Sequence, residues 1–236
     1  MRIKEQFNRH ANSYNNYSHI QKIGAKILTN EIKEPIKNIA DLGCGDGRIY
    51  NELINKNMDF KNFYAIDFAS DMLTKHPKNK NIQEIYGDFN SKELFLKLQK
   101  YHIDVVVSSS ALQWAKNLNF TFNESSKIAP KGYFFIFTSN TFKTMHNTID
   151  IKSPIYSKKE IIKFFSNNYK INKIKTYNFE LEFKSTIDML YYIKKSGVSG
   201  GMNIGYKAMK KLINTYPKKY LEFETILLIG DSKCLN

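Results

Sequence analysis

Residues 39–48 read Ile-Ala-Asp-Leu-Gly-Cys-Gly-Asp-Gly-Arg, and this stretch decides the fold class. Glycines at positions 43, 45 and 47 separate an apolar strand pattern from a helical one, and a turn of this kind lets the backbone approach a ligand closely. The spacing is G-x-G-x-G, whereas dinucleotide-binding turns have G-x-G-x-x-G. Asp41, just before the turn, would repel a pyrophosphate. The turn therefore favours a ligand that carries a positive amine and no phosphate.

Strand and helix patterns alternate from residue 36 onward, until a pair of helices interrupts the last two strands. We expect strands over 36–42, 62–67, 82–86, 103–108, 133–138, 169–183 and 222–229. We expect helices over 49–57, 70–75, 91–101, 120–129, 157–165, 185–196 and 204–216. The near-continuous apolar run at 103–108 is typical of a strand buried on both faces of a parallel sheet. The pattern predicts an α/β, Rossmann-like, doubly wound and mostly parallel seven-stranded sheet with helices on both faces, an antiparallel last strand and a helical insertion before it.

The domain organisation follows from length and the absence of linker sequence. The chain has 236 residues and no Gly/Ser-rich or Pro-rich stretch, so we expect a single domain over 1–236. Within it we expect an N-terminal helical cap over 1–35, a cofactor-binding half over 36–138 and a substrate-side half over 139–236. The helical insertion should occupy about 185–216.

The charge balance is strongly basic, with 36 Lys plus Arg against 22 Asp plus Glu and a formal net charge of +14. Acidic partners are therefore one interpretation. The other is compositional drift, because the excess is lysine and the chain is also rich in Asn and Ile. Only Arg2, Arg9 and Arg48 are arginines, and this scarcity disfavours nucleic-acid recognition.

Cellular context is predicted from what the sequence lacks. No apolar stretch approaches the roughly 18 residues of a membrane-spanning helix, and residues 1–6 carry no apolar signal region, so we expect a cytoplasmic protein with no membrane contact. Cys44 and Cys234 are too few for a disulfide framework or a zinc site, and no metal is expected. We expect a monomer.

Carboxylates follow two further strands. Asp67 ends the strand at 62–67, about 20 residues after the turn, where it could accept hydrogen bonds from both hydroxyls of a ribose. The alternative is an ordinary strand-end or helix N-cap residue. Asp88 repeats the layout after the next strand, followed by Phe89.

The run at 41–47 resembles motif I of the class I methyltransferases that use S-adenosyl-L-methionine and release S-adenosyl-L-homocysteine. The resemblance implies that the glycine backbone lies along the methionine moiety, with Asp41 organising contacts to its amino group. It also implies that Asp88 contacts the adenine amino group and that Phe89 or Met72 covers the adenine ring. For Phe89 and Met72 the alternative is a role in core packing. The cofactor-binding residues expected on this basis are Asp41, Gly43, Gly45, Gly47, Asp67, Phe68, Met72, Asp88, Phe89 and Ser108.

The string Ala-Leu-Gln-Trp at 111–114 resembles the malonyl-[acyl-carrier protein] O-methyltransferases of biotin synthesis. Residues 7–21, 194–198 and 220–229 also resemble that family. Two departures are Ser-Gly-Gly-Met at 199–202 and Ser109, where the family commonly has Asn. The resemblance implies methylation of the free carboxylate of a malonyl thioester on acyl carrier protein. The substrate-binding residues expected are Tyr14, Gln113, Trp114 and Lys143.

Methyl transfer to a carboxylate is a matter of positioning. A carboxylic acid with a pKa of about 4 is already ionised at neutral pH, so no general base is required and no catalytic residue is assigned. The five histidines form no evident His/Asp pair, although His10 and His146 could lie near the cleft. An acidic carrier would be attracted if the lysines of the insertion share one face: Lys194, Lys195, Lys207, Lys210 and Lys211. Alternatives are a methyltransferase for a free small carboxylic acid or quinone precursor, an RNA methyltransferase or RNA-binding protein, and an inactive binder.

Overall fold

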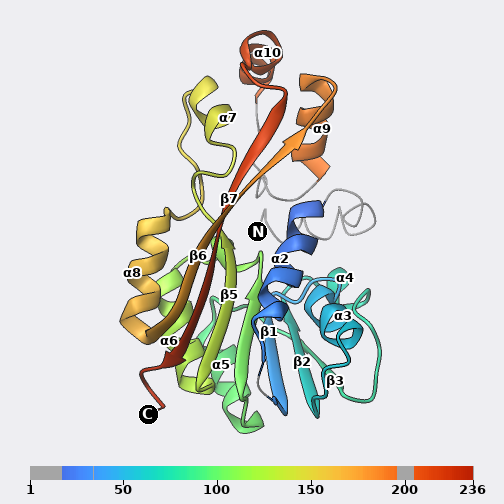
Figure 1. Ribbon diagram of the computed structural model, residues 1–236, viewed down its shortest axis with the longest axis vertical. Coiled ribbons are helices and arrows are strands. Elements are labelled where there is room, and N and C mark those ends of the chain that lie inside the picture. Colours follow the sequence, from blue (N-terminus) through green and yellow to red (C-terminus); the bar gives the residue numbers. More distant parts are fainter. Residues whose placement is uncertain (1–17, 34, 196–204, 236) are drawn as a thin grey trace.

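The computed structural model describes residues 18–33, 35–195 and 205–235 (Figure 1). In chain order its elements are α2 (His19–Asn30), β1 (Asn38–Leu42), α3 (Arg48–Asn55), β2 (Asn62–Asp67), α4 (Ser70–Leu73), β3 (Ile82–Tyr86), α5 (Lys92–Leu98), the 3-10 turn η2 (Gln99–Tyr101), β4 (Val105–Ser109), the 3-10 turn η3 (Leu112–Trp114), α6 (Leu118–Ile128), β5 (Lys131–Phe137), α7 (Lys143–Thr148), α8 (Lys158–Asn168), β6 (Tyr169–Glu182), α9 (Thr186–Lys195), α10 (Tyr206–Thr215) and β7 (Tyr220–Ser232). None of the described helices is both long and apolar enough to span a bilayer.

The seven strands form one sheet in the order β3-β2-β1-β4-β5-β7-β6. The first five in this order run parallel, and β7 lies antiparallel between β5 and β6. The order reverses direction between β1 and β4, which leaves a crevice beyond the carboxyl ends of these two strands. The predicted fold class, with its antiparallel last strand and the helices before it, is confirmed.

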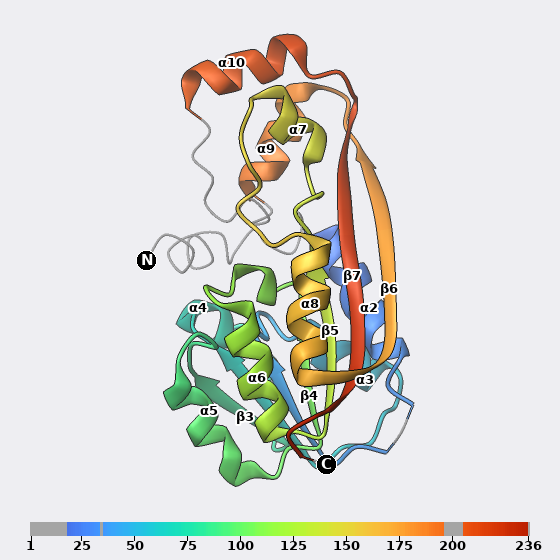
Figure 2. The ribbon, with the colours of Figure 1, turned by 90° about the vertical axis from the view of Figure 1, so that its left-hand side faces the viewer.

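Helices cover both faces of the sheet because the central strands are apolar on both faces. On one face Val106 and Phe134 pack with α5, α6 and α8, which lie together in Figure 2. On the other face Val105, Val107 and Phe135 pack with α2 and α3. The alternation along β4 divides its valines between two separate hydrophobic clusters, as expected for a buried parallel strand.

Above the parallel strands, β6 and β7 continue as a long antiparallel ribbon, and we call the region built on it the upper lobe (Figures 1 and 2). The lobe comprises residues 139–156 with α7, the paired segments 178–182 and 220–224, and helices α9 and α10. It has its own apolar cluster, whose fully buried members include Met145, Leu212 and Phe223.

Several element bounds differ from the sequence prediction. Helix α7 was not expected, because residues 143–148 are mostly polar and too few to show a helical period. The last strand extends beyond 222–229 to Tyr220–Ser232, because β6 pairs with it along nearly its whole length. A capping box formed by Ser157 and Glu160 marks the start of α8, within the helix expected at 157–165.

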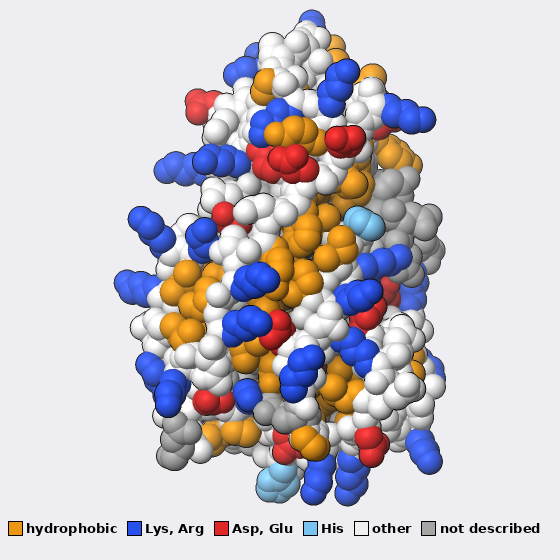
Figure 3. Space-filling model, viewed as in Figure 1, with side chains coloured by type: hydrophobic (Ala, Val, Ile, Leu, Met, Phe, Trp, Pro, Cys, Tyr) orange, Lys and Arg blue, Asp and Glu red, His pale blue; other side chains and the backbone are white. Residues whose placement is uncertain are grey.

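Strand β6 forms one edge of the sheet and is fourteen residues long. Its pairing with β7 shifts register between Ile171 and Lys173, and exposed Lys170 and Lys175 lie along it. Lysines are scattered over the face of the molecule in Figure 3 and do not gather in one patch there.

Candidate cofactor site

The glycine turn between β1 and α3 is held against the end of β2. The backbone N–H groups of Gly43 and Cys44 both donate to the Ile66 carbonyl oxygen, at 2.8 and 2.9 Å. Gly43, Gly45 and Gly47 have φ values of +76, +55 and +85°, a region that side-chain-bearing residues rarely adopt. Glycine adopts these φ values without strain, which explains three glycines within five residues of this turn.

A cavity of about 630 Å³ lies where β1, β2 and β4 end. Its wall is formed by the glycine turn, the segments that follow β2, β3 and β4, and helix α2. The lining residues are Gln21, Ala25, Asp41, Gly43, Cys44, Gly45, Asp46, Arg48, Ile49, Asp67, Phe68, Met72, Asp88, Phe89, Asn90, Ser109, Ser110, Ala111, Trp114 and Lys116. The cavity thus occupies the crevice that the strand order creates.

Asp41 is the most unusual group in this wall. Its side chain is 1% exposed, and neither carboxylate oxygen has a hydrogen-bond partner in the described structure. Burial, with a further contribution from the nearby Asp67 carboxylate, raises the pKa of Asp41 well above its usual value. A buried and unpartnered carboxylate is costly, so the cavity is completed best by a ligand that brings a positive donor to Asp41.

Asp67 is held in place by the backbone. Its Oδ2 accepts from the Gly45 N–H at 2.9 Å and its Oδ1 accepts from the Ala69 N–H at 2.8 Å. Burial raises the pKa of Asp67, and the backbone hydrogen bonds oppose that rise. The Phe68 N–H is a third backbone donor to this carboxylate, and the remaining acceptor capacity can take a hydroxyl hydrogen from a ligand in the cavity.

The third strand end supplies a different surface. Phe68, Met72 and Phe89 contribute apolar walls to the cavity, while Asp88 is partly exposed at its rim. The Oδ1 atom of Asp88 accepts from both the backbone and the side chain of Asn90, at 2.9 and 2.7 Å. An apolar slot beside a fixed carboxylate suits a flat ring that carries an amino group.

Three residues expected to bind the cofactor or substrate lie away from this wall. Ser108 is fully buried and donates to the Leu42 carbonyl oxygen at 2.6 Å, so its hydroxyl joins β4 to β1. Gly47 starts α3, and a Cβ there would collide with Pro77. Gln113 is buried and donates to the Ser110 carbonyl oxygen at 2.6 Å, which supports the wall from behind.

The other expected substrate residues fall in three places. Trp114 lines the cofactor cavity. Lys143 lines a separate cavity in the upper lobe. Tyr14 lies outside the described residues, as does His10.

The structure adds lining residues that the sequence did not assign to the cofactor or substrate site. Ser109 and Ser110 line the cavity in place of Ser108, and neither hydroxyl oxygen has a partner in the described structure. Ser110 has φ of +62°, a strained conformation for serine that is common at functional sites. Gln21 and Ala25 reach the cavity from α2. The Arg48 guanidinium lies beside them and donates to Asp46 at 3.0 Å and to the Ser18 hydroxyl at 2.6 Å.

Comparison with known proteins agrees with this geometry. Residues 40–136 match the family described as "Methyltransferase domain". Together with the sheet order, the match defines a class I domain dependent on S-adenosyl-L-methionine, and the chain contains such a methyltransferase domain. The unpartnered Asp41, the fixed Asp67 and the apolar slot fit the amino, ribose and adenine groups of S-adenosyl-L-methionine respectively.

The curated relatives carry a more particular name. The malonyl-[acyl-carrier protein] O-methyltransferase of Bacillus cytotoxicus is 27% identical over 156 residues, which cover 63% of this chain and 54% of that protein. The chain therefore spans about half the length of this relative. Malonyl-[acyl-carrier protein] O-methyltransferase 2 of Coxiella burnetii is 26% identical over 217 residues, covering 84% and 81% of the two chains. Among solved structures, the YcgJ protein of Bacillus subtilis shares the fold, with a TM-score of 0.65 at 13% identity over 91% of this chain and 99% of that one.

Proposed function

We propose that this methyltransferase methylates the free carboxylate of a malonyl thioester carried on acyl carrier protein. Two relatives with this name align with this chain at 27% and 26% identity. The alignment with the second relative covers 81% of that relative's length. The Leu-Gln-Trp segment at 112–114 supports the same reading, because Trp114 lines the cavity and Gln113 fixes the backbone beside it.

The observation that carries the choice of acceptor is the Lys116 ammonium group in the described wall of the cofactor cavity, a partner for an anionic acceptor. A phenol or amine acceptor needs a base to remove its proton, whereas a carboxylate is already ionised. Bound S-adenosyl-L-methionine would supply a methyl group already activated on a sulfonium sulfur. The protein must then orient the acceptor and exclude water, and Lys116, which lines the cavity, can attract the anionic end.

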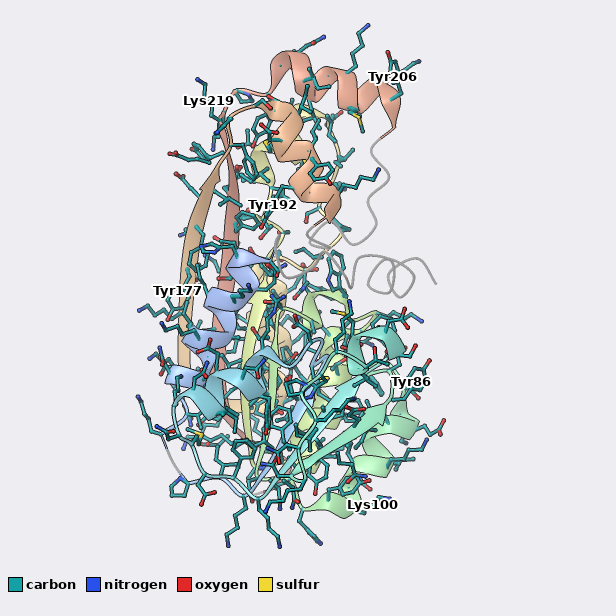
Figure 4. The ribbon with its side chains drawn as sticks, turned by 90° about the vertical axis from the view of Figure 1, so that its right-hand side faces the viewer. Tyr86, Lys100, Tyr177, Tyr192, Tyr206 and Lys219 are labelled. Carbon is teal, nitrogen blue, oxygen red and sulfur yellow. The ribbon has the colours of Figure 1, made fainter. Side chains whose placement is uncertain are left out.

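The upper lobe supports a protein-borne acceptor. Lys207, Lys210 and Lys211 are exposed on α10 at a spacing that places them on one side of the helix. Exposed Tyr206, Met209 and Ile213 form a neighbouring apolar stripe, and Figure 4 shows Tyr206 at the far end of the lobe. An acidic carrier would meet both complementary charge and apolar contact there.

The test is to incubate the protein with methyl-labelled S-adenosyl-L-methionine and, separately, malonyl-carrier protein, malonyl-CoA, small carboxylic acids, a quinone precursor and total RNA. We expect label on the malonyl carrier as a methyl ester, which mild alkali releases as methanol. The carrier bearing an acetyl group is the matched control, because it lacks the free carboxylate and should stay unlabelled. Label confined to RNA, or to an alkali-stable methyl group on a quinone precursor, would contradict the proposal.

A further inference from the structure

A second cavity, of about 420 Å³, lies at the base of the upper lobe. It is bounded by the end of β5, helix α7, the segment 151–155 and the start of α8. It shares no lining residue with the cofactor cavity among the described residues. The lining residues are Ser139, Asn140, Lys143, His146, Asn147, Ile151, Lys152, Ser153, Ile155, Ser157 and Glu160.

Two polar groups in this wall are buried without a partner. His146 is 5% exposed, and neither of its ring nitrogens makes a hydrogen bond in the described structure. The hydroxyl oxygen of Ser153 is likewise buried and unpartnered. Buried polar groups in folded proteins are nearly always paired, so these two groups indicate a ligand that hydrogen-bonds to them.

Among the described lining residues, the lysines outnumber the acids by two to one, and the Glu222 and Glu224 carboxylates lie just outside the lining, near His146 and Asn140. Lys143 and Lys152 contribute two exposed ammonium groups to the rim. Glu160 is the one acid among the described lining residues, and its Oε2 accepts from the Ser157 N–H at 2.8 Å and from the Ser157 hydroxyl at 2.6 Å. Its carboxylate is therefore engaged in capping α8, which leaves the lysines to act on a ligand.

His146 supplies a neutral donor. Burial lowers the pKa of His146, and the nearby Glu222 carboxylate only partly opposes this. The imidazole is then neutral near pH 7, with a hydrogen on one nitrogen. Two ammonium groups, an imidazole N–H and serine hydroxyls match the several oxygens of a phosphate group better than they match an apolar or cationic ligand.

We propose that this second cavity binds a phosphate group. The ligand is either inorganic phosphate or the phosphate of a phosphopantetheine arm, and the second source rests on the proposed function. Tyr156 connects the two cavities: its carbonyl oxygen accepts from the Ser139 N–H at 2.9 Å, and its hydroxyl lies 3.0 Å from the carbonyl oxygen of Lys116. Residue 156 therefore contacts both Ser139 in the wall of the second cavity and the segment that carries Trp114 and Lys116.

The experiment measures binding to the full chain by calorimetry, and the ring signals of His146 by nitrogen-resolved NMR. The probes are inorganic phosphate, phosphopantetheine and pantetheine. We expect the phosphate-bearing probes to shift the His146 signals, pantetheine to bind at least tenfold more weakly than phosphopantetheine, and Lys143→Gln/Lys152→Gln to weaken phosphate binding at least tenfold. Lys61→Gln/Lys170→Gln, which removes the same charge from exposed positions outside both cavities, should leave binding unchanged.

Three outcomes would overturn the proposal: unshifted His146 signals at saturating phosphate, equal binding of pantetheine and phosphopantetheine, or equal weakening by the two lysine pairs. If phosphate binds while malonyl-carrier protein is not methylated, the phosphate site is supported and the proposed function is contradicted. If the carrier is methylated and no phosphate probe binds, the proposed function is supported and the phosphate site is contradicted.

Discussion

The parallel half of the sheet and the upper lobe are held together by different interactions. In the parallel half, β1 and β4 are buried on both faces, and the cofactor cavity is fixed by backbone hydrogen bonds such as Gly45 N–H to Asp67. In the upper lobe the described helices α7, α9 and α10 pack on a two-stranded ribbon, around a separate and smaller apolar cluster.

On the proposed function, the parallel half binds the cofactor and the upper lobe contacts the carrier that brings the acceptor. The residues proposed to contact the cofactor lie on turns that several backbone hydrogen bonds hold to the sheet. We therefore expect few substitutions to be tolerated in these turns. The lobe depends on a smaller apolar cluster and presents side chains on surfaces, where substitution is less costly. Variants in the two regions should therefore fail in different ways.

The largest effect is expected from Gly43→Ala in the parallel half. Gly43 has φ of +76°, and an added Cβ would collide with the Ala111 methyl group. Left-handed backbone and overpacking together predict a loss of about 2–5 kcal/mol in the free energy of unfolding, measured by urea denaturation. Gly205→Ala in the lobe is the matched control, because no atom lies within 4 Å of its added Cβ, and it should change stability little. Equal stability of the two variants would contradict the expected difference in tolerance between the glycine turn and the lobe.

The next effect is expected from Asp41→Asn, which should weaken S-adenosyl-L-methionine binding by about 1.5–3 kcal/mol in calorimetry, because a charge-assisted contact is lost. The variant also has a pH signature. Burial raises the pKa of Asp41 in the folded chain, so the folded state retains a proton that the unfolded state releases. Stability of the cofactor-free protein should fall as the pH rises from about 4 through the raised pKa, and Asp41→Asn should flatten that fall. Exposed Asp59→Asn should alter neither property.

A smaller effect, confined to acceptor use, is expected from Lys207→Gln/Lys210→Gln/Lys211→Gln on α10. Loss of electrostatic attraction should lower kcat/KM for malonyl-carrier protein about tenfold at low salt and leave malonyl-CoA turnover unchanged. Replacing Lys33, Lys61 and Lys170, which are exposed outside the lobe, should have no such selective effect. An equal loss of kcat/KM with malonyl-carrier protein and malonyl-CoA would contradict a specific role of α10 in binding the carrier.

The smallest effect is expected at the junction of the regions, where α8 follows the upper-lobe segment 139–156. Ser157 accepts from the Glu160 N–H as part of a capping box. Ser157→Ala should cost about 1 kcal/mol of stability and increase hydrogen exchange in the first turn of α8, with cofactor affinity unchanged. Unaltered exchange there would show that the cap does not hold the junction.

The sequence predicted the parallel half better than the lobe for identifiable reasons. Asp41, Asp67 and Asp88 lie at or just beyond the carboxyl ends of β1, β2 and β3, and parallel strands bring such positions to one edge, where all three line the cavity. The choice of Ser108 over Ser109 and Ser110 depended on where β4 ends, which composition alone does not mark. Residues 139–156 show no period, so the separate cavity around Lys143 had no signal in the sequence. Gln21 and Ala25 reach the site only through the packing of α2, where Gly24 faces Phe135.

The register shift near the start of β6 bears on how the protein behaves at high concentration. An exposed edge fourteen residues long would otherwise offer a template for strands of neighbouring molecules. The irregularity between Ile171 and Lys173, flanked by like-charged Lys170 and Lys175, makes a poor template for intermolecular strand addition. The start of the ribbon that carries the lobe is thereby made less receptive to strand addition along its free edge.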